Sequence, residues 1–137
     1  MSYTIKELQI GQSATFTKTI SETDVYLFAG VTGDFNPAHV NAQYAEGTPF
    51  QERIAHGMLS ASLISTVLGT HLPGMGTIYA KQEVAFKAPV HFGDTITAKV
   101  EVEEIIEEKN RVKMKTTCTN QDGVVVVDGY AVVLPPR

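Results

Sequence analysis

The chain has a single cysteine, Cys118, among its 137 residues. Without a second thiol it can form neither an internal disulfide nor a zinc site built from several thiolates. A lone thiol is typical of proteins kept in a reducing compartment, so we expect a cytoplasmic protein. Cys118 lies in an alternating segment, and we interpret it as a small buried hydrophobic residue.

Long apolar runs and basic clusters are also missing. The most apolar stretch, 58–69, is broken by serine and threonine and is shorter than the roughly 18 residues of a membrane span. The first twenty residues mix Lys, Glu, Gln and Thr with apolar positions, unlike a secretory signal. The net charge is −4 and no Lys/Arg cluster exceeds a pair, so we expect neither a membrane nor a nucleic acid as partner.

Signatures of metal and nucleotide sites are absent as well. The spacing of the four histidines does not resemble a zinc triad, so we expect no metal site. The glycine-containing segment 73–76 lacks the Lys-Ser/Thr of a phosphate-binding loop. With no internal repeat and 43% hydrophobic residues, the composition indicates one domain over residues 1–137 with a real core.

The pattern of the remaining sequence predicts an α+β domain. A strand is expected at Ser13–Ile20, followed by a helix that Ser21 caps and that ends near Gly33. A short helix is expected at Asn41–Glu46. The longer helix Gly57–Thr70 has apolar residues all around its helical wheel, which predicts a buried helix.

The second half of the chain reads as strands. They are Thr77–Phe86, Thr95–Ile106, Arg111–Asn120 and Val124–Leu134, with a hairpin turn at 121–123 between the last two. One buried helix followed by long antiparallel strands indicates a curved sheet that wraps the helix.

Asp34 and His39 are the first candidates for chemistry. They flank a stiff, non-helical turn, because Pro37 lacks an amide hydrogen and pushes Asn36 toward extended backbone. A carboxylate and an imidazole held close together can activate one water molecule. Asp-Phe-Asn-Pro is also ordinary turn-forming sequence, so a purely structural role stays open on spacing alone.

The second candidate is His56-Gly57, at the beginning of the long helix. Amide groups in the first turn of a helix point outward with the positive end of its dipole, and Gly57 lets an oxygen approach closely. Each such donor stabilises a developing oxyanion by about 3 kcal/mol. His-Gly can also simply shape the start of the helix. Ser65, two turns on, can bond either to Asp34 or His39 or to the helix carbonyl four residues back.

Several segments together resemble a known family. The cluster from Phe28 through Val31-Thr32-Gly33-Asp34-Phe35-Asn36-Pro37 to His39 and Ala45 resembles the hydratase signature of the MaoC-like dehydratase family. Segments 55–59, 62–65, 72–74, 86–90 and 93–94 are similar to its short (R)-specific enoyl-CoA hydratases, so the resemblance covers essentially the whole chain. One departure is Ala38, where a larger aliphatic residue is usual.

The resemblance implies a hot-dog fold, in which an antiparallel sheet wraps one long helix. It implies that Asp34 and His39 bind and activate the hydrating water, with Asp34 as general base. It further implies that the Gly57 amide binds the thioester oxygen and that Ser65 supports the site.

The implied substrate is an enoyl-CoA, with no cofactor because CoA is part of the substrate. The implied assembly is a homodimer with the thioester tunnel between subunits. We expect substrate contacts from Asn36 and His56 and an acyl pocket lined by Leu63, Val67 and Leu68. Arg53 and Lys87 are candidates for the CoA phosphates, although ordinary surface roles fit both.

Three alternatives remain open on the sequence. The first is the same chemistry on acyl chains attached to a carrier protein. The second is thioester hydrolysis, which is common on this fold, although the Asp-Phe-Asn-Pro-x-His signature favours hydration. The third is a non-catalytic module that binds acyl thioesters.

Overall fold

Strand β1 (Ser13–Thr19) leads directly into helix α1 (Glu22–Thr32) in the computed structural model, which describes all 137 residues. The predicted helix start is confirmed, because Ser21 and Asp24 form a capping box. The backbone N–H of Ser21 donates to the Asp24 carboxyl and lowers its pKa. Gly33 ends the helix with a φ of 80°, a left-handed conformation that glycine adopts readily.

The predicted non-helical turn after Gly33 is only partly correct. Residues 33–36 are irregular, but Pro37 begins the short helix α2 (Pro37–Val40), so His39 lies within a helix. Proline is favoured at the first helical position, because its missing N–H has no partner there and its φ is already suitable. Asn41 then separates α2 from α3 (Ala42–Glu46), and its side chain accepts from the Tyr44 amide.

The long helix and the strands agree with the sequence to within about one residue at each end. Helix α4 is Gly57–Thr70, and the strands are β2 (Ile78–Phe86), β3 (Thr95–Ile106), β4 (Arg111–Thr119) and β5 (Val125–Leu134). The hairpin turn is confirmed by Gly123, with a φ of 75°, and by paired Asn120 and Val124. A short 3₁₀ helix, Glu107–Lys109, joins β3 to β4.

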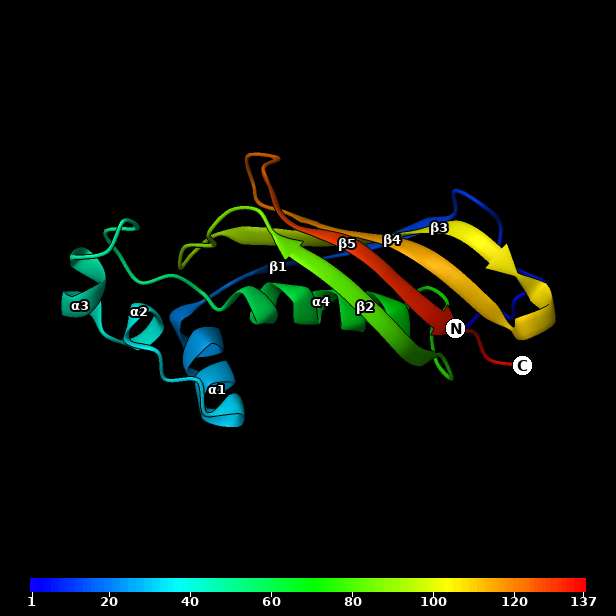
Figure 1. Ribbon diagram of the computed structural model, residues 1–137, viewed down its shortest axis with the longest axis horizontal. Helices are drawn as coiled ribbons and strands as arrows, with labels where there is room; N and C mark the ends of the chain where they lie inside the picture. The colour runs from blue at the N-terminus through cyan, green and yellow to red at the C-terminus, as the bar shows by residue number, and fades with distance from the viewer.

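The five strands form one antiparallel sheet in the order β1-β3-β4-β5-β2. Figure 1 shows this sheet curving over α4, while α1, α2 and α3 lie together beyond one end of the helix. This arrangement is the predicted hot-dog fold. Strands β1 and β2 are the two edges, so each has one side without a strand partner.

The core lies between α4 and the concave face of the sheet. Alternate residues of β3 and β4 point into it, as the period of two requires for a sheet with one buried face. Helix α4 contributes Leu63, Ile64, Val67 and Leu68, all of them buried. None of the helices is long and apolar enough to cross a membrane.

Candidate active site

The loop after α1 holds Asp34 by local hydrogen bonds. One carboxylate oxygen of Asp34, Oδ1, accepts from the Asn36 amide at 3.2 Å, and Oδ1 of Asn36 accepts from the Ala38 amide at 3.0 Å. The Asp-Phe-Asn-Pro sequence therefore does form a turn and cap of the usual kind. The Asp34 side chain is still 51% exposed, so its second oxygen, Oδ2, remains available.

His39 is oriented by the backbone of a distant loop. Its Nδ1 lies 2.7 Å from the carbonyl oxygen of Ile54. A carbonyl can only accept, so Nδ1 bears the hydrogen and, in the neutral ring, Nε2 keeps a free lone pair. The ring is thus fixed with a basic nitrogen available for a proton.

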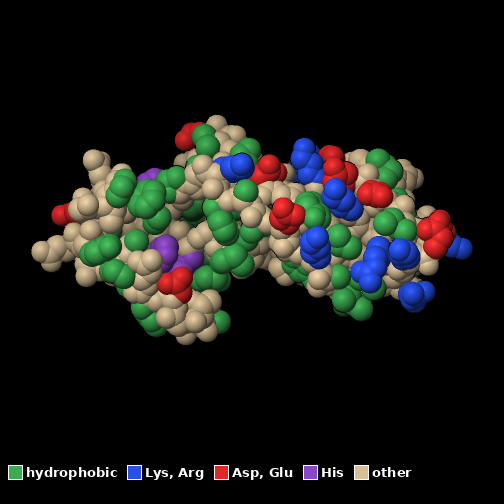
Figure 2. Space-filling view, in the orientation of Figure 1, with side chains coloured by type: hydrophobic (Ala, Val, Ile, Leu, Met, Phe, Trp, Pro, Cys, Tyr) green, Lys and Arg blue, Asp and Glu red, His purple; other side chains and the backbone are tan.

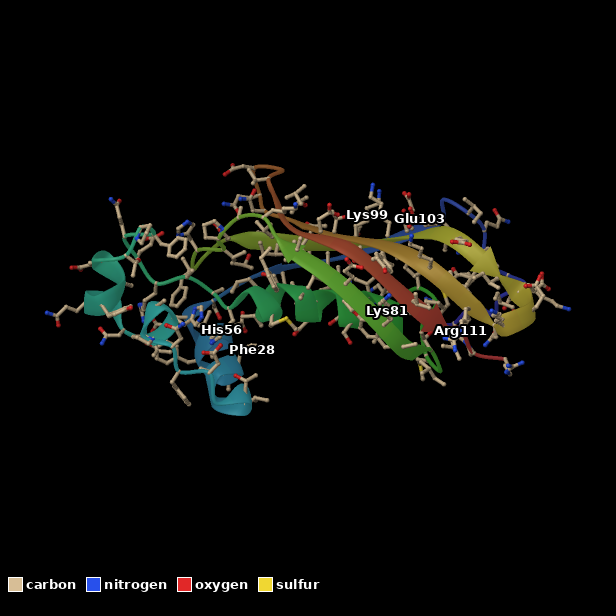
Figure 3. The ribbon with its side chains drawn as sticks, in the orientation of Figure 1. Phe28, His56, Lys81, Lys99, Glu103 and Arg111 are labelled. Atoms are coloured by element: carbon tan, nitrogen blue, oxygen red, sulfur yellow. The ribbon has the colours of Figure 1, made fainter.

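His56 joins the two. Its ring stacks on that of His39, with centroids 3.9 Å apart and planes 26° from parallel, and its Nε2 lies 2.9 Å from the backbone carbonyl oxygen of Asp34. The same nitrogen is 4.0 Å from Oδ2 of Asp34. Phe28, from α1, also packs against His56, with ring centroids 5.0 Å apart and planes tilted by 56°. Figure 3 shows Phe28 and His56 together between α1 and the beginning of α4.

Asp34, His39 and His56 lie on the wall of a cavity of about 470 Å³. Gly57 belongs to the same wall as the first residue of α4, where the helix amides have no carbonyl partners within the helix. The remaining wall is mainly apolar, from the 50–60 segment, the end of β2 and the beginning of β5: Phe50, Ile54, Ala55, Met58, Ser60, Phe86, Lys87, Ala88, Pro89, Val90, Val126 and Val127. Figure 2 shows histidines beside an acidic side chain among hydrophobic residues at this end.

Asp34, His39 and His56 also have a spacing that a metal ion could use. One ligand atom from each residue lies within 4.8 Å of the other two. However, each ring already uses one nitrogen on a backbone carbonyl. An ion would therefore have to use Nε2 of His39 and the buried Nδ1 of His56, or displace one of these two hydrogen bonds.

The structure brings together four of the nine predicted site residues, Asp34, His39, His56 and Gly57. It does not place Ser65 with them. Ser65 lies about 12 Å further along α4, in an exposed groove between α4 and β2 that it shares with Tyr79 and Gln82. Within a single chain, Ser65 therefore cannot support Asp34 or His39.

The other predicted substrate contacts are elsewhere too. Asn36 caps α2 and does not reach the cavity wall. Leu63, Val67 and Leu68 belong to the core beneath α4, with Val67 and Leu68 completely buried. The helical wheel cannot tell these positions from cavity positions, because both faces of α4 are apolar.

The two basic candidates behave differently. Arg53 donates to Glu22 at 2.7 Å and to Tyr26 at 2.8 Å, and its guanidinium lies 4.7 Å from the centroid of the Phe92 ring. Arg53 thus connects α1 to the loop before α4. Lys87 lies on the cavity wall, where a phosphate outside the cavity could reach it.

Sequence analysis missed Ile54, Ser60 and Phe86. Ile54 acts through its carbonyl, which every residue has, so no side-chain pattern could reveal it. Ser60 is buried on the cavity wall and its hydroxyl has no hydrogen-bond partner in the chain. Its place in the first turn of the helix, close to His56-Gly57, was the one available signal.

Comparison with known proteins gives one consistent result. The family described as "MaoC like domain" matches residues 6–124. The chain is 56% identical over 131 residues to the (R)-specific enoyl-CoA hydratase of Rhodospirillum rubrum, covering 96% of this chain and 90% of that one. It is 47% identical to the 3-hydroxybutyryl-CoA dehydratase of Methylorubrum extorquens, covering 96% and 83%.

Among solved structures, the R-hydratase PhaJ1 from Pseudomonas aeruginosa in the unliganded form superposes with a TM-score of 0.93. It is 50% identical, and the match covers 98% of this chain and 86% of that one.

Proposed function

Because this chain belongs to the MaoC-like dehydratase family, we infer that it is an (R)-specific enoyl-CoA hydratase. The reaction is the reversible addition of water to a trans-2-enoyl-CoA, which gives the (R)-3-hydroxyacyl-CoA. The observation that supports it best is the placement of Asp34 and His39 beside Gly57 on one cavity wall. Water activation and stabilisation of an oxyanion thus have their groups within one site.

Asp34 and His39 are proposed to bind the hydrating water between them. The free Oδ2 of Asp34 removes a proton as the water oxygen bonds to C3, and Nε2 of His39 accepts a hydrogen bond or a proton from the same water. The two groups therefore share the proton that the water loses. The proton that C2 gains is returned from this pair.

The Gly57 amide is proposed to bind the thioester oxygen. When C3 gains the hydroxyl, the electrons of the double bond move toward that oxygen and form an enolate-like centre. An amide donor at the positive end of α4 stabilises this charge, and the absence of a side chain at Gly57 leaves room for close approach. The mechanism requires no cofactor besides the CoA of the substrate.

The acyl chain is proposed to occupy the apolar part of the cavity, between Met58, Phe86 and Val126. A longer chain would have to enter between α4 and the sheet to reach Leu63, Val67 and Leu68. Lys87 is the proposed contact for a CoA phosphate, because it is the one basic side chain on the cavity wall.

The test is loss of enoyl-thioester ultraviolet absorbance with crotonyl-CoA and medium-chain enoyl-CoAs, with chiral analysis of the product. We expect D34N and H39Q to lower kcat by about 10²- to 10⁴-fold. D122N and H71Q are matched controls in the exposed hairpin turn and at the far end of α4, and both should keep wild-type rates. An inactive wild type, or fully active D34N and H39Q, would contradict the proposal.

The same assay separates the alternatives. Equal or faster turnover of acyl chains on a carrier protein would favour a carrier-protein dehydratase. Release of free thiol from saturated acyl-CoA would favour a thioesterase.

We further propose that the enzyme is a homodimer. The exposed face of α4, with Met58, Ser62 and Ser65, lies beside the unpaired edge of β2, where Ile78 and Tyr79 are also exposed. An interface there would put Ser65 next to the partner subunit. Light scattering should give the dimer mass, and Ser62→Arg should give a monomer with reduced activity; a monomeric wild type would exclude the proposal.

A cytoplasmic location is also proposed. The only thiol, Cys118, is unpaired and buried, and burial raises its pKa to about 12. It stays protonated and has no disulfide partner, as is usual in a reducing compartment. Cell fractionation with antibody detection tests this location.

A further inference from the structure

We propose that His56 is a positioning residue that fixes Asp34, His39 and the Gly57 amide relative to one another. The proposal rests on the proposed function, because those three groups are the ones assigned to the hydration reaction. It revises the role expected from the sequence, in which His56 contacts the substrate. A substrate contact would not need the hydrogen bond to Asp34 or the stacking on His39 that the His56 ring makes.

The ring of His56 is enclosed by protein. The residue is 2% exposed, and its ring packs against those of Phe28 and His39. Its Nε2 must bear a hydrogen, since the Asp34 carbonyl oxygen 2.9 Å away can only accept. Its Nδ1 is buried and has no partner. Nε2 is therefore engaged by the Asp34 loop, and Nδ1 is closed to solvent in this arrangement.

The hydrogen bond from His56 holds the backbone carbonyl of Asp34, and the side chain of Asp34 is the proposed base. Fixing the carbonyl of Asp34 fixes the peptide plane from which its Cα and carboxylate project. The local turn bonds hold the Asp34 amide, which donates to Oγ1 of Thr32 at 3.1 Å, and the Oδ1 atom, while the side chain is half exposed. The bond from His56 adds a hold on the Asp34 carbonyl from the residue directly before α4.

The stacking contact acts on the other member of the pair. The hydrogen bond from Nδ1 of His39 to the Ile54 carbonyl fixes one point of the ring. The ring can still tilt about that bond. The ring of His56, 3.9 Å away and nearly parallel, blocks this tilt from one face. Together the two contacts direct Nε2 of His39.

His56 is also the N-cap residue of α4, directly before Gly57. Its backbone and its ring thus connect the amide for the oxyanion with both groups for the water. A shift of about 1 Å in such an arrangement can cost about 100-fold in rate without weakening substrate binding.

Two substitutions separate the hydrogen bond from the stacking. H56F keeps an aromatic ring on His39 but removes the donor to the Asp34 carbonyl. H56Q keeps an N–H donor near the Nε2 position but removes the ring. Because each variant loses one of the two contacts, we expect both to lower kcat by about 10- to 100-fold, with KM changed less than about threefold.

The controls are the wild type and H71F. His71 is the C-cap of α4, outside the cavity wall, so H71F should keep wild-type kinetics. Thermal unfolding of each variant shows whether it is folded at the assay temperature. If the wild type does not hydrate enoyl-CoA, the proposed function fails, whereas the inference about His56 fails only when the wild type is active.

A second measurement does not depend on substitution. Nitrogen-15 NMR of the wild-type histidine rings should find opposite tautomers, with hydrogen on Nε2 in His56 and on Nδ1 in His39. The inference is overturned by equal tautomers, by full kcat in both H56F and H56Q, or by a rise in KM alone. The last result would make His56 a substrate contact.

Discussion

The aromatic ring of Phe86 lies directly against Gly57, so that a β-carbon at residue 57 would fall 2.6 Å from Cδ1 of Phe86. No real β-carbon tolerates such a distance, and the ring would have to move. Phe86, at the end of β2, is 53% exposed and has room to do so. The absence of a side chain at Gly57 thus lets two groups come close to its backbone: the Phe86 ring from the sheet and the proposed thioester oxygen from the cavity.

Gly57→Ala should fold and lose activity. Alanine is well accepted in the first turn of a helix, so the free energy of unfolding should fall by no more than about 1 kcal/mol after the Phe86 ring moves. The added methyl group should lower kcat/KM by about 10²-fold, since it stands where the oxygen approaches the amide. Steady-state kinetics and urea unfolding measure the two effects.

A double variant and a matched glycine complete this test. G57A/F86A removes the collision between the new methyl group and the Phe86 ring. If the methyl group itself blocks the amide, the double variant should stay as inactive as G57A. G69A changes a glycine in the same helix whose β-carbon would meet nothing within 4 Å, and it should gain about 0.5–1 kcal/mol of stability with unchanged kinetics. Recovery of activity in G57A/F86A would assign the loss to the displaced ring.

Gly129→Ala should destabilise the sheet strongly. A β-carbon there would lie 1.8 Å from the backbone oxygen of Glu83 in the neighbouring strand β2. Backbone atoms of a paired strand cannot move aside as a side chain can, so we expect a loss of about 3 kcal/mol or more. Thermal unfolding should show a large fall in Tm, whereas G30A, in an open position of α1, should leave it unchanged or higher.

Alkaline conditions should destabilise the fold through Cys118. Burial raises the pKa of this thiol from 9.0 to about 12, so the folded state keeps the proton that the unfolded state releases. The contribution is complete below pH 9 and is lost as the pH rises toward 12. Cys118→Ala should therefore lose less unfolding free energy than the wild type between pH 8 and 10.5, when both are measured in urea.

Tyr79 should also lower the stability of the fold at alkaline pH, so its contribution needs a separate control. Although Tyr79 is 38% exposed, partial burial raises the pKa of its phenol from 10.0 to about 12. Tyr79→Phe should also flatten the dependence of stability on pH, but only above pH 10. Equal slopes for the wild type and both variants would show that neither group is protected in solution.

Removal of divalent metals should not change the rate. In the proposed mechanism Asp34 and His39 activate water directly, even though they and His56 have a spacing that an ion could use. Treatment with EDTA followed by gel filtration should leave kcat and KM unchanged. Added Zn²⁺ should inhibit, because an ion on these side chains would displace the water. Loss of activity with EDTA and its return with Zn²⁺ would require a metal mechanism.

The sequence predicted the elements well because their signals are local. The Ser21–Asp24 capping box and Gly33 mark both ends of α1, and Gly123 marks the hairpin turn. The alternation in β3 and β4 gives the buried face. Helix α2 was not predicted, because a proline after a turn fits a non-helical segment as well as the first position of a new helix.

The candidate site was predicted in part. Asp34, His39, His56 and Gly57 could be chosen from the sequence because they are residues of unusual chemistry in short motifs. Ser65, Leu63, Val67 and Leu68 lie on other faces of α4, in the groove toward β2 or in the core. A helix that is apolar all around does not reveal which of its faces borders a cavity.

By itself, the sequence determined the α+β class, the order of the strands along the chain and the residues capable of acid–base chemistry. Only the tertiary structure decided the sheet order β1-β3-β4-β5-β2, the cavity wall, and which nitrogen of His39 and of His56 bears a hydrogen. The physical reason is that caps and periodicity act within a few residues. The bonds that orient both rings end on the backbone carbonyls of Ile54 and Asp34, and only folding brings those carbonyls to them.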